Sequence, residues 1–264
     1  MDTKTLMAAL RGEFVEKPGD RLCAVHGGYT VRTFATDEGK YVGEFPAECP
    51  ACKADAITAA ERSLREAKLR EDMQTADIPL AYLPCTFRNY LPTCPDAQAV
   101  LATVREYAKN FADHRKVARS MTLQGSPGTG KTHLGVALLK AVMWEGGSGR
   151  YSTMADMVQA IRSTWSRSSS DSEAAVIRRY TAVDLLVLDE VDAASSRSDN
   201  EVGLISNVID QRSRNLRPTV ISGNVTKAEL LAAIGDRAAD RMRDHGGLMV
   251  VMDWSSYRGV RKTA

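Results

Sequence analysis

The chain has 264 residues, with 35 Lys and Arg against 33 Asp and Glu, so its formal net charge is only +2. This balance excludes a polycation that binds nucleic acid through its bulk charge, and any such binding must use a local patch. No apolar run approaches the roughly 18 residues of a membrane span, and the N-terminus lacks a secretory signal, so we expect a cytoplasmic protein without a membrane partner. The length predicts one full-sized domain and a smaller one.

Two pairs of metal-ligand residues stand near the N-terminus, in the patterns C-x₂-H and C-x₂-C. Between them lie short β-like runs at residues 29–34 and 41–42. Such pairs around a small β-rich insert are typical of a structural zinc ribbon, which we predict over residues 1–54. Bound Zn²⁺ would stabilise the fold of this segment, because its apolar core is too small to do so by itself. The predicted ligands are Cys23, His26, Cys49 and Cys52. The alternative is incidental thiols, as we expect Cys85 and Cys94 to be.

Residues 55–80 are predicted to form a connector. The stretch 55–75 contains no glycine or proline and is built from good helix formers. Glu61 and Arg65 stand at the i,i+4 spacing that supports a helix exposed to solvent, and the apolar stripe of this helix is thin. A loop with several prolines then leads to an expected helix from about Asp96 to His114.

From Ser120 onward, short apolar runs alternate with longer helical patterns. This alternation predicts a parallel α/β sheet, in a domain that we place at residues 81–264. The expected strands are Ser120–Gln124, Gly149–Thr153, Leu185–Asp189, Thr219–Ser222 and Leu248–Met252. The expected helices cover residues 131–146, 155–165, 172–180, 201–213, 226–233 and 235–243.

A phosphate-binding loop is predicted where the first of these strands meets a helix. Residues 125–132 have the complete GxxxxGK[ST] pattern. Its glycines let backbone N–H groups point at an anion at the positive end of a helix, while Lys131 reaches the outer phosphates and Thr132 ligates Mg²⁺. The predicted nucleotide-binding residues are Gly125, Ser126, Pro127, Gly128, Thr129, Gly130, Lys131, Thr132, His133 and Asp189.

Two acidic residues, Asp189 and Glu190, end the buried strand 185–189. Open α/β sheets place their ligand sites at such strand ends. Asp189 suits a Mg²⁺ ligand, and Glu190 suits the base that polarises an attacking water. A solvated turn is the alternative, and the phosphate loop earlier in the chain favours the nucleotide site. Together the two motifs predict Mg-ATP binding and hydrolysis.

Polar residues beyond the next strand are candidates for the same chemistry. Asn224 stands where it would orient water, although a turn asparagine is an equal alternative on residue type alone. Arg237 and Arg241 share one helix face and suit charge stabilisation of a transferring phosphate. By themselves they fit equally a surface helix that forms ion pairs through Asp236 and Asp240.

The order of these motifs resembles the bacterial and phage DnaC-type helicase loaders, which are AAA+ ATPases related to the initiator DnaA. The likeness covers about two-thirds of the chain, and its collinear motifs are more specific than the nucleotide motifs alone. The matching stretches are residues 85–90, 125–134, 155–157, 183–190, 217–219 with Asn224, 235–243 and 253–258. The likeness implies a AAA+ P-loop fold, a three-layer parallel sheet without the small C-terminal lid domain.

The resemblance also implies roles and partners. Asn224 matches the first sensor, Arg237 the arginine finger that reaches the next subunit's ATP, and Arg241 a second, ATP-sensing arginine. The implied partners are a hexameric replicative helicase, single-stranded DNA and further copies of the chain. The resemblance does not cover residues 1–75, whose zinc domain we expect to recruit the helicase, with DNA as the alternative.

A local patch for single-stranded DNA is predicted at Arg162, Trp165 and Arg167, because an aromatic ring stacks on bases and arginines follow phosphates. Trp165 falls where the family carries an aromatic residue implicated in this contact, and a core tryptophan is the alternative.

Two other functions compete with the helicase loader. A transposition helper ATPase of the IstB type shares the fold but acts on duplex DNA with a transposase. The segments 87–90 and 254–258 favour the loader. An adaptor that binds ATP without turnover is disfavoured by the intact Lys131, Asp189 and Glu190.

Overall fold

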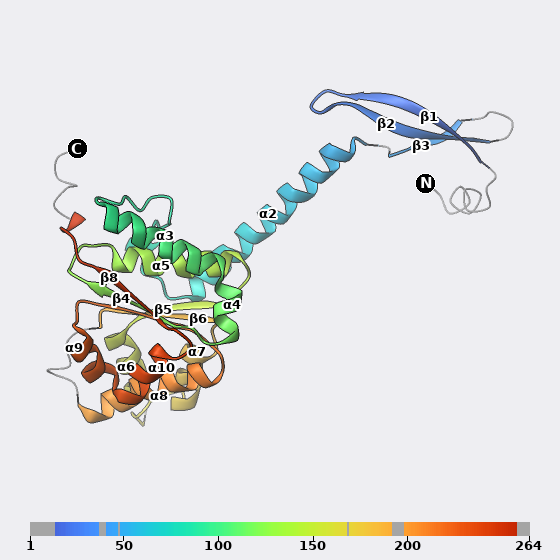
Figure 1. Ribbon diagram of the computed structural model, residues 1–264. Helices are drawn as coiled ribbons and strands as arrows, with labels where there is room; N and C mark the ends of the chain where they lie inside the picture. The colour runs from blue at the N-terminus through green and yellow to red at the C-terminus, as the bar shows by residue number, and fades with distance from the viewer. Residues whose placement is uncertain (1–13, 37–40, 47, 168, 192–197, 258–264) are drawn as a thin grey trace. The chain divides into compact units, whose positions relative to one another are not determined.

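A computed structural model describes residues 14–36, 41–46, 48–167, 169–191 and 198–257 (Figure 1). The chain divides into two compact units, Met1–Glu66 and Ala67–Ala264, which we describe separately. Across the described residues, no helix is both long enough and apolar enough to cross a membrane.

The described part of the first unit is a three-stranded antiparallel sheet followed by a helix. The strands, in the order β1-β2-β3, are β1 (Phe14–Cys23), β2 (Gly27–Thr36) and β3 (Tyr41–Phe45). Cys23 pairs with Gly27, so the C-x₂-H segment forms the turn of the first hairpin. Helix α2 (Pro50–Thr75) begins inside the C-x₂-C segment. Among the side chains described in this unit, only Val31 and Cys49 are buried.

The end of α2 belongs to the second unit. Leu69 and Met73 pack against its apolar core, and the carbonyl of Ala76 accepts a hydrogen bond of 2.8 Å from the backbone N–H of Tyr151. The first turns of the predicted connector helix are therefore exposed to solvent, and its last turns pack against the core of the second unit.

The second unit is a five-stranded parallel sheet between two helical layers, so the predicted three-layer fold is confirmed. The strand order is β5-β6-β7-β4-β8. The strands are β4 (Met121–Gly125), β5 (Gly149–Thr153), β6 (Leu185–Asp189), β7 (Thr219–Gly223) and β8 (Leu248–Met252). All five stand within one residue of their predicted positions, because buried apolar runs bounded by polar residues mark them clearly.

Each face of the sheet is covered by its own helices (Figure 1). One layer holds η1 (Leu80–Tyr82), α3 (Pro95–Lys109), α4 (Phe111–Lys116) and α5 (Lys131–Trp144). The other holds α6 (Met154–Ser163), α7 (Glu173–Thr181), α8 (Asp199–Arg214), α9 (Lys227–Ile234) and α10 (Asp236–Arg243). A separate apolar cluster lies under each layer. No helical lid follows β8 in the part of the chain described, which runs to Tyr257.

One predicted helix is wrong in detail. The helix expected from Asp96 to His114 is broken at Asn110, where α3 ends and α4 begins. Asn110 leaves helical geometry, its side chain donates a 2.6 Å hydrogen bond to Glu106, and its carbonyl accepts from the N–H groups of Asp113 and His114. A short polar side chain that bonds locally competes in this way with continuous helix.

Candidate functional site

The loop between β4 and α5 is built around glycines that no other residue can replace. Gly125, at φ 157°, has no room for a Cβ, which would clash with the carbonyl oxygen of Met252. Gly130 adopts φ 97° directly before α5 and is packed against Tyr90. The resulting curve places backbone N–H groups at the N-terminus of α5, where a helix favours anions.

The charged side chain of the loop lies inside this curve. Lys131 Nζ donates hydrogen bonds to the carbonyls of Gly125 (2.7 Å) and Ser126 (2.8 Å). These are the contacts that a bound phosphate would replace, because an ammonium group pairs more strongly with an anion than with a neutral carbonyl.

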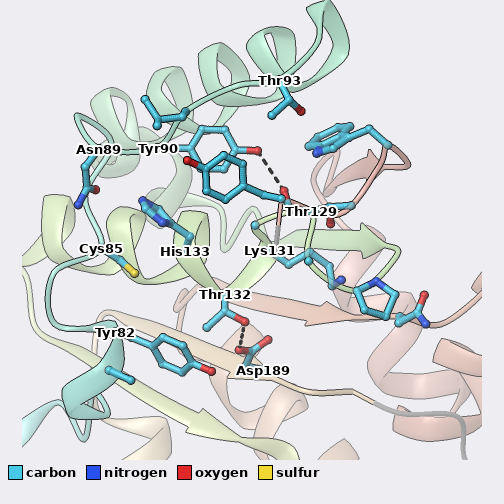
Figure 2. Close-up of a pocket in the computed structure, with 18 of the residues that line it drawn as sticks. Tyr82, Cys85, Asn89, Tyr90, Thr93, Thr129, Lys131, Thr132, His133 and Asp189 are labelled. Atoms are coloured by element: carbon cyan, nitrogen blue, oxygen red, sulfur yellow. Dashed lines mark hydrogen bonds between the residues drawn. The ribbon is translucent and has the colours of Figure 1, made fainter. Parts of the chain in front are cut away.

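Asp189 stands opposite the loop, at the end of β6, and its side chain is only 3% exposed. Thr132 donates to its Oδ2 at 2.6 Å (Figure 2), Tyr151 donates to the same oxygen at 2.8 Å, and Ser222 donates to Oδ1. A threonine hydroxyl beside a carboxylate at this place suits a Mg²⁺ site. Glu190 follows in a left-handed conformation, at φ 55°, which turns the chain sharply after the strand.

The loop and the strand ends open into one cavity of about 750 Å³. Its lining includes the predicted residues from Pro127 to His133 together with Asp189, Glu190 and Asn224. Gly125 and Ser126 form the base of the loop outside that lining. The structure therefore gathers these predicted residues around one space large enough for a nucleotide.

The remaining walls come from segments to which the sequence alone assigned no contact. Tyr82, Cys85, Asn89 and Tyr90 enter from the segment before α3, as Figure 2 shows, and Trp254 and Tyr257 enter from the segment after β8. The Tyr90 hydroxyl donates to the Thr129 carbonyl at 3.1 Å, and the Tyr257 N–H donates to the Gly128 carbonyl at 3.0 Å. Residues 85–90 and 253–258 belong to the stretches that resemble the helicase loaders, and this resemblance was the one indication in the sequence that the two segments contribute to the site.

His133 has a supporting position on this wall. Its Nε2 lies 2.8 Å from the carbonyl of Thr86, and its ring meets that of Tyr90 edge-on, with centroids 5.4 Å apart. It ties α5 to the segment before α3.

The two predicted arginines share one face of α10, but they are not among the residues that line the cavity. Both engage Asp210 of α8: Arg237 Nη2 lies 2.9 Å from Oδ2, and Arg241 Nε lies 3.2 Å from Oδ1. Arg214 pairs with the same carboxylate. The ion-pair partners are thus Asp210 and, for Arg241, Asp244, rather than Asp236 and Asp240.

Asp210 is charged in spite of its position. Its side chain is only 2% exposed, and burial by itself raises the pKa of the carboxyl, but hydrogen bonds from Arg214 and Arg241 hold the pKa below its usual range. Arg237 keeps 62% of its side chain exposed.

The predicted DNA patch lies at the surface of the second unit. The Trp165 side chain is 54% exposed, which excludes the alternative of a core tryptophan, and its indole N–H donates to Glu173 at 2.6 Å. Arg162 forms an ion pair of 2.5 Å with Glu201, and Arg167 is exposed.

The four predicted metal ligands of the first unit converge. Their ligand atoms all lie within 4.8 Å of one another. The Sγ atoms of Cys23 and Cys52 are 3.5 Å apart, and His26 Nδ1 lies 3.3–3.9 Å from the three sulfurs. In a tetrahedral zinc site, bonds of about 2.3 Å to sulfur and 2.0 Å to nitrogen separate the ligand atoms from one another by similar distances.

Neighbouring groups suit the same cluster. His26 Nε2 lies 2.9 Å from Asp55, which orients the ring so that Nδ1 faces the sulfurs, as carboxylates do beside zinc-bound histidines. Backbone N–H groups of His26 and Val25 hydrogen-bond Cys23 and lower the pKa of its thiol to about 6. The donor set therefore fits a structural Zn²⁺.

Comparison with known proteins agrees with the fold and the cavity. The family described as IstB-like ATP binding protein matches residues 59–263. The replicative helicase loader DnaC of Escherichia coli K12 is 33% identical over 200 residues, which cover 76% of this chain and 80% of that protein. DnaC of Buchnera aphidicola subsp. Schizaphis graminum is 30% identical over 203 residues, covering 76% and 81%.

Solved structures give the same result. The crystal structure of the DnaC helicase loader superposes with a TM-score of 0.59 at 25% identity, covering 66% of this chain and 99% of that one. AMPPCP-bound DnaA from Aquifex aeolicus shares the fold, with a TM-score of 0.56 at 21% identity over 67% and 52% of the two chains. The chain therefore belongs to the IstB-like ATP-binding proteins and, among them, to the AAA+ ATPase family of the DnaC helicase loaders.

Proposed function

We propose that this protein is an ATP-dependent loader that binds a hexameric replicative DNA helicase and places it on single-stranded DNA during replication initiation. The observation that carries this proposal is the identity with DnaC over 200 residues, which include an undamaged ATP site. The resemblance to a loader thus extends well beyond the nucleotide motifs.

The cavity supports ATP hydrolysis with a definite division of roles. Lys131 and the loop N–H groups would bind the phosphates, and Thr132 and Asp189 would hold Mg²⁺. Mg²⁺, when bound, neutralises charge that develops on the transferring phosphoryl group. Glu190 would accept a proton from the attacking water, and Asn224 on the same wall would orient that water.

The arginines support assembly of several copies. Arg237 and Arg241 do not line the cavity of their own chain, so an arginine finger would have to act on the ATP of a neighbouring subunit. Arg237 would then exchange Asp210 for a phosphate, and its exposed side chain can reach a partner.

A mixing experiment tests this action in trans. Arg237→Ala and Glu190→Gln subunits should each lose hydrolysis while they keep ATP affinity, and a mixture should recover activity. Arg243→Ala is the matched control, because Arg243 is exposed on the same helix and its side chain donates to the Ala239 carbonyl within that helix. Failure of the mixture to exceed the separate activities would contradict the finger assignment.

Two further parts of the proposal concern the partners. The exposed Trp165, with Arg162 and Arg167, would contact single-stranded DNA by stacking and phosphate contacts. The zinc-holding unit would recruit the helicase, because it lies outside the stretch in which the nucleotide site is built.

The second candidate is the IstB-type transposition helper, because the matching family carries that name. A loading assay separates the two. The full chain is incubated with ATP, a purified replicative hexamer and a closed single-stranded DNA circle. We expect the helicase to elute with the circle only when both the chain and ATP are present, and not with Lys131→Ala. No transfer of helicase, together with binding of duplex DNA and a transposase, would select the IstB-type function.

A further inference from the structure

Tyr151 is a buried tyrosine whose hydroxyl contacts the carboxylate of Asp189, the proposed Mg²⁺ ligand. It lies in β5, is only 2% exposed, and donates to Asp189 Oδ2 at 2.8 Å. The sheet register explains the contact: Thr153 pairs with Asp189, and Tyr151, two residues earlier, points to the same face. Its side chain reaches diagonally across to the neighbouring strand end.

The hydrogen bonds of Asp189 fall into two groups. Thr132 donates from the phosphate loop, and its hydroxyl is the one expected to turn to Mg²⁺. Tyr151 and Ser222 donate from β5 and β7, the strands on either side of β6, and each takes a different oxygen of the carboxylate. With Thr132 engaged elsewhere, these two bonds would still fix the plane of the carboxylate.

The Tyr151 hydroxyl is itself held in place. The backbone N–H of Tyr151 donates to the Ala76 carbonyl at 2.8 Å, and its ring packs against that of Tyr82 with centroids 6.1 Å apart. In its contact with Asp189, the phenolic O–H of Tyr151 is the donor and the carboxylate oxygen is the acceptor.

We propose that Tyr151 is a positioning residue for the metal: its hydroxyl, with that of Ser222, sets the orientation in which Asp189 meets Mg²⁺. Mg²⁺ needs such support because it tolerates little departure from octahedral geometry. Partners of this kind behind a metal ligand are typically worth a factor of about 10–100 in metal affinity. The inference rests on the proposed Mg-ATP site.

The test measures how Mg²⁺ changes the affinity for ATP. A general loss of structure would instead lower the affinity both with and without Mg²⁺. The full chain is titrated with a fluorescent ATP analogue in EDTA and at a series of Mg²⁺ concentrations. For Tyr151→Phe we expect unchanged affinity in EDTA and a half-saturating Mg²⁺ concentration raised about 10–100-fold. Ser222→Ala should shift the Mg²⁺ dependence in the same direction. Tyr107→Phe is the matched control, because Tyr107 is also buried but donates to the Arg119 carbonyl.

Two results would overturn the inference. One is a Mg²⁺ dependence of Tyr151→Phe equal to that of the unmodified chain, and the other is an equal loss of affinity in EDTA and in Mg²⁺, which indicates a purely structural role. If Tyr151→Phe does not fold, Ser222→Ala decides between the same outcomes. An unmodified chain that binds the analogue without any response to Mg²⁺ would instead refute the proposed Mg-ATP site.

Discussion

The two units of this protein hold their folds by different means. The ATPase unit has an apolar cluster on each face of its sheet, with many side chains withdrawn from water. The first unit has only Val31 and Cys49 buried among its described side chains, but four metal ligands converge in it. Apolar burial of roughly 25 cal/mol per Å² can stabilise the larger unit, whereas a sheet of three strands has too little such area and needs another source of free energy.

The two units also differ in the sites that they carry. The matched family begins at residue 59, so the ATP site lies within it and the metal cluster lies before it. We expect a variant that impairs one unit to leave the other unit intact.

The largest effect is expected on removing zinc. Structural Zn²⁺ sites contribute roughly 10–16 kcal/mol of binding free energy, so Cys49→Ser or a chelator should unfold the sheet of the first unit. Metal analysis, together with limited proteolysis, measures the loss, and ATP binding by the second unit should not change. Cys94→Ser is the control, because Cys94 accepts the N-cap hydrogen bond of α3, a role that serine also fills. A first unit that contains no zinc would refute the ribbon.

The next effect concerns Arg212, whose side chain is completely buried in the ATPase unit. Its guanidinium donates to Thr219 and to the carbonyls of Tyr180, Val183, Asp184 and Pro218. Arg212→Met leaves these acceptors unpaired and should lower the free energy of unfolding of this unit by about 3–5 kcal/mol. Chemical denaturation measures the change, and zinc content should stay constant. A change below about 1 kcal/mol would mean that the buried network relaxes around the new side chain.

Lys131→Ala should act on binding rather than on folding. Loss of charged hydrogen bonds to phosphate, worth roughly 3 kcal/mol, should weaken ATP binding by about 100-fold. Lys116→Ala is the control, because Lys116 is exposed and pairs with Asp113, three residues before it on the same helix. Normal ATP affinity in Lys131→Ala, measured by calorimetry, would refute the site.

The smallest effect is expected at Trp165. Trp165→Ala should weaken binding of single-stranded DNA by about 1–3 kcal/mol, the range for stacking of one base. Fluorescence anisotropy with a labelled oligonucleotide measures the change. Because the side chain is exposed, the midpoint of thermal unfolding should hardly move. Unchanged DNA affinity would remove this tryptophan from the proposed interface.

The sequence predicted the ATPase unit better than the first unit, for physical reasons. Buried strands such as Leu185–Asp189 are apolar runs that end in chemistry-bearing residues, so both strand and site can be recognised. Strand β1 was not expected, because its sequence FVEKPGDRLC mixes charged residues with glycine and proline. The strand forms through its antiparallel pairing with β2. Hairpin pairing is a tertiary property that such a composition hides.

The contacts around the ATP site show a second limit of prediction from sequence. Tyr151 and Ser222 reach Asp189 across 38 and 33 residues, and Asp210 meets Arg237 across 27. A single hydroxyl or carboxylate within an otherwise apolar pattern indicates that it has some partner when buried, but not which one. Motifs with fixed spacing, such as residues 125–132, were therefore predictable, and their supporting partners were not.

The decisive measurement is the affinity for the helicase, with and without ATP, of the full chain and two variants. We expect Cys49→Ser to lose helicase binding while it still binds ATP. We expect Lys131→Ala to bind the helicase with an affinity that ATP no longer changes. Retention of the helicase by zinc-free Cys49→Ser, at the affinity of the unmodified chain, would contradict the proposal that the first unit recruits the helicase while the ATPase unit makes loading depend on ATP.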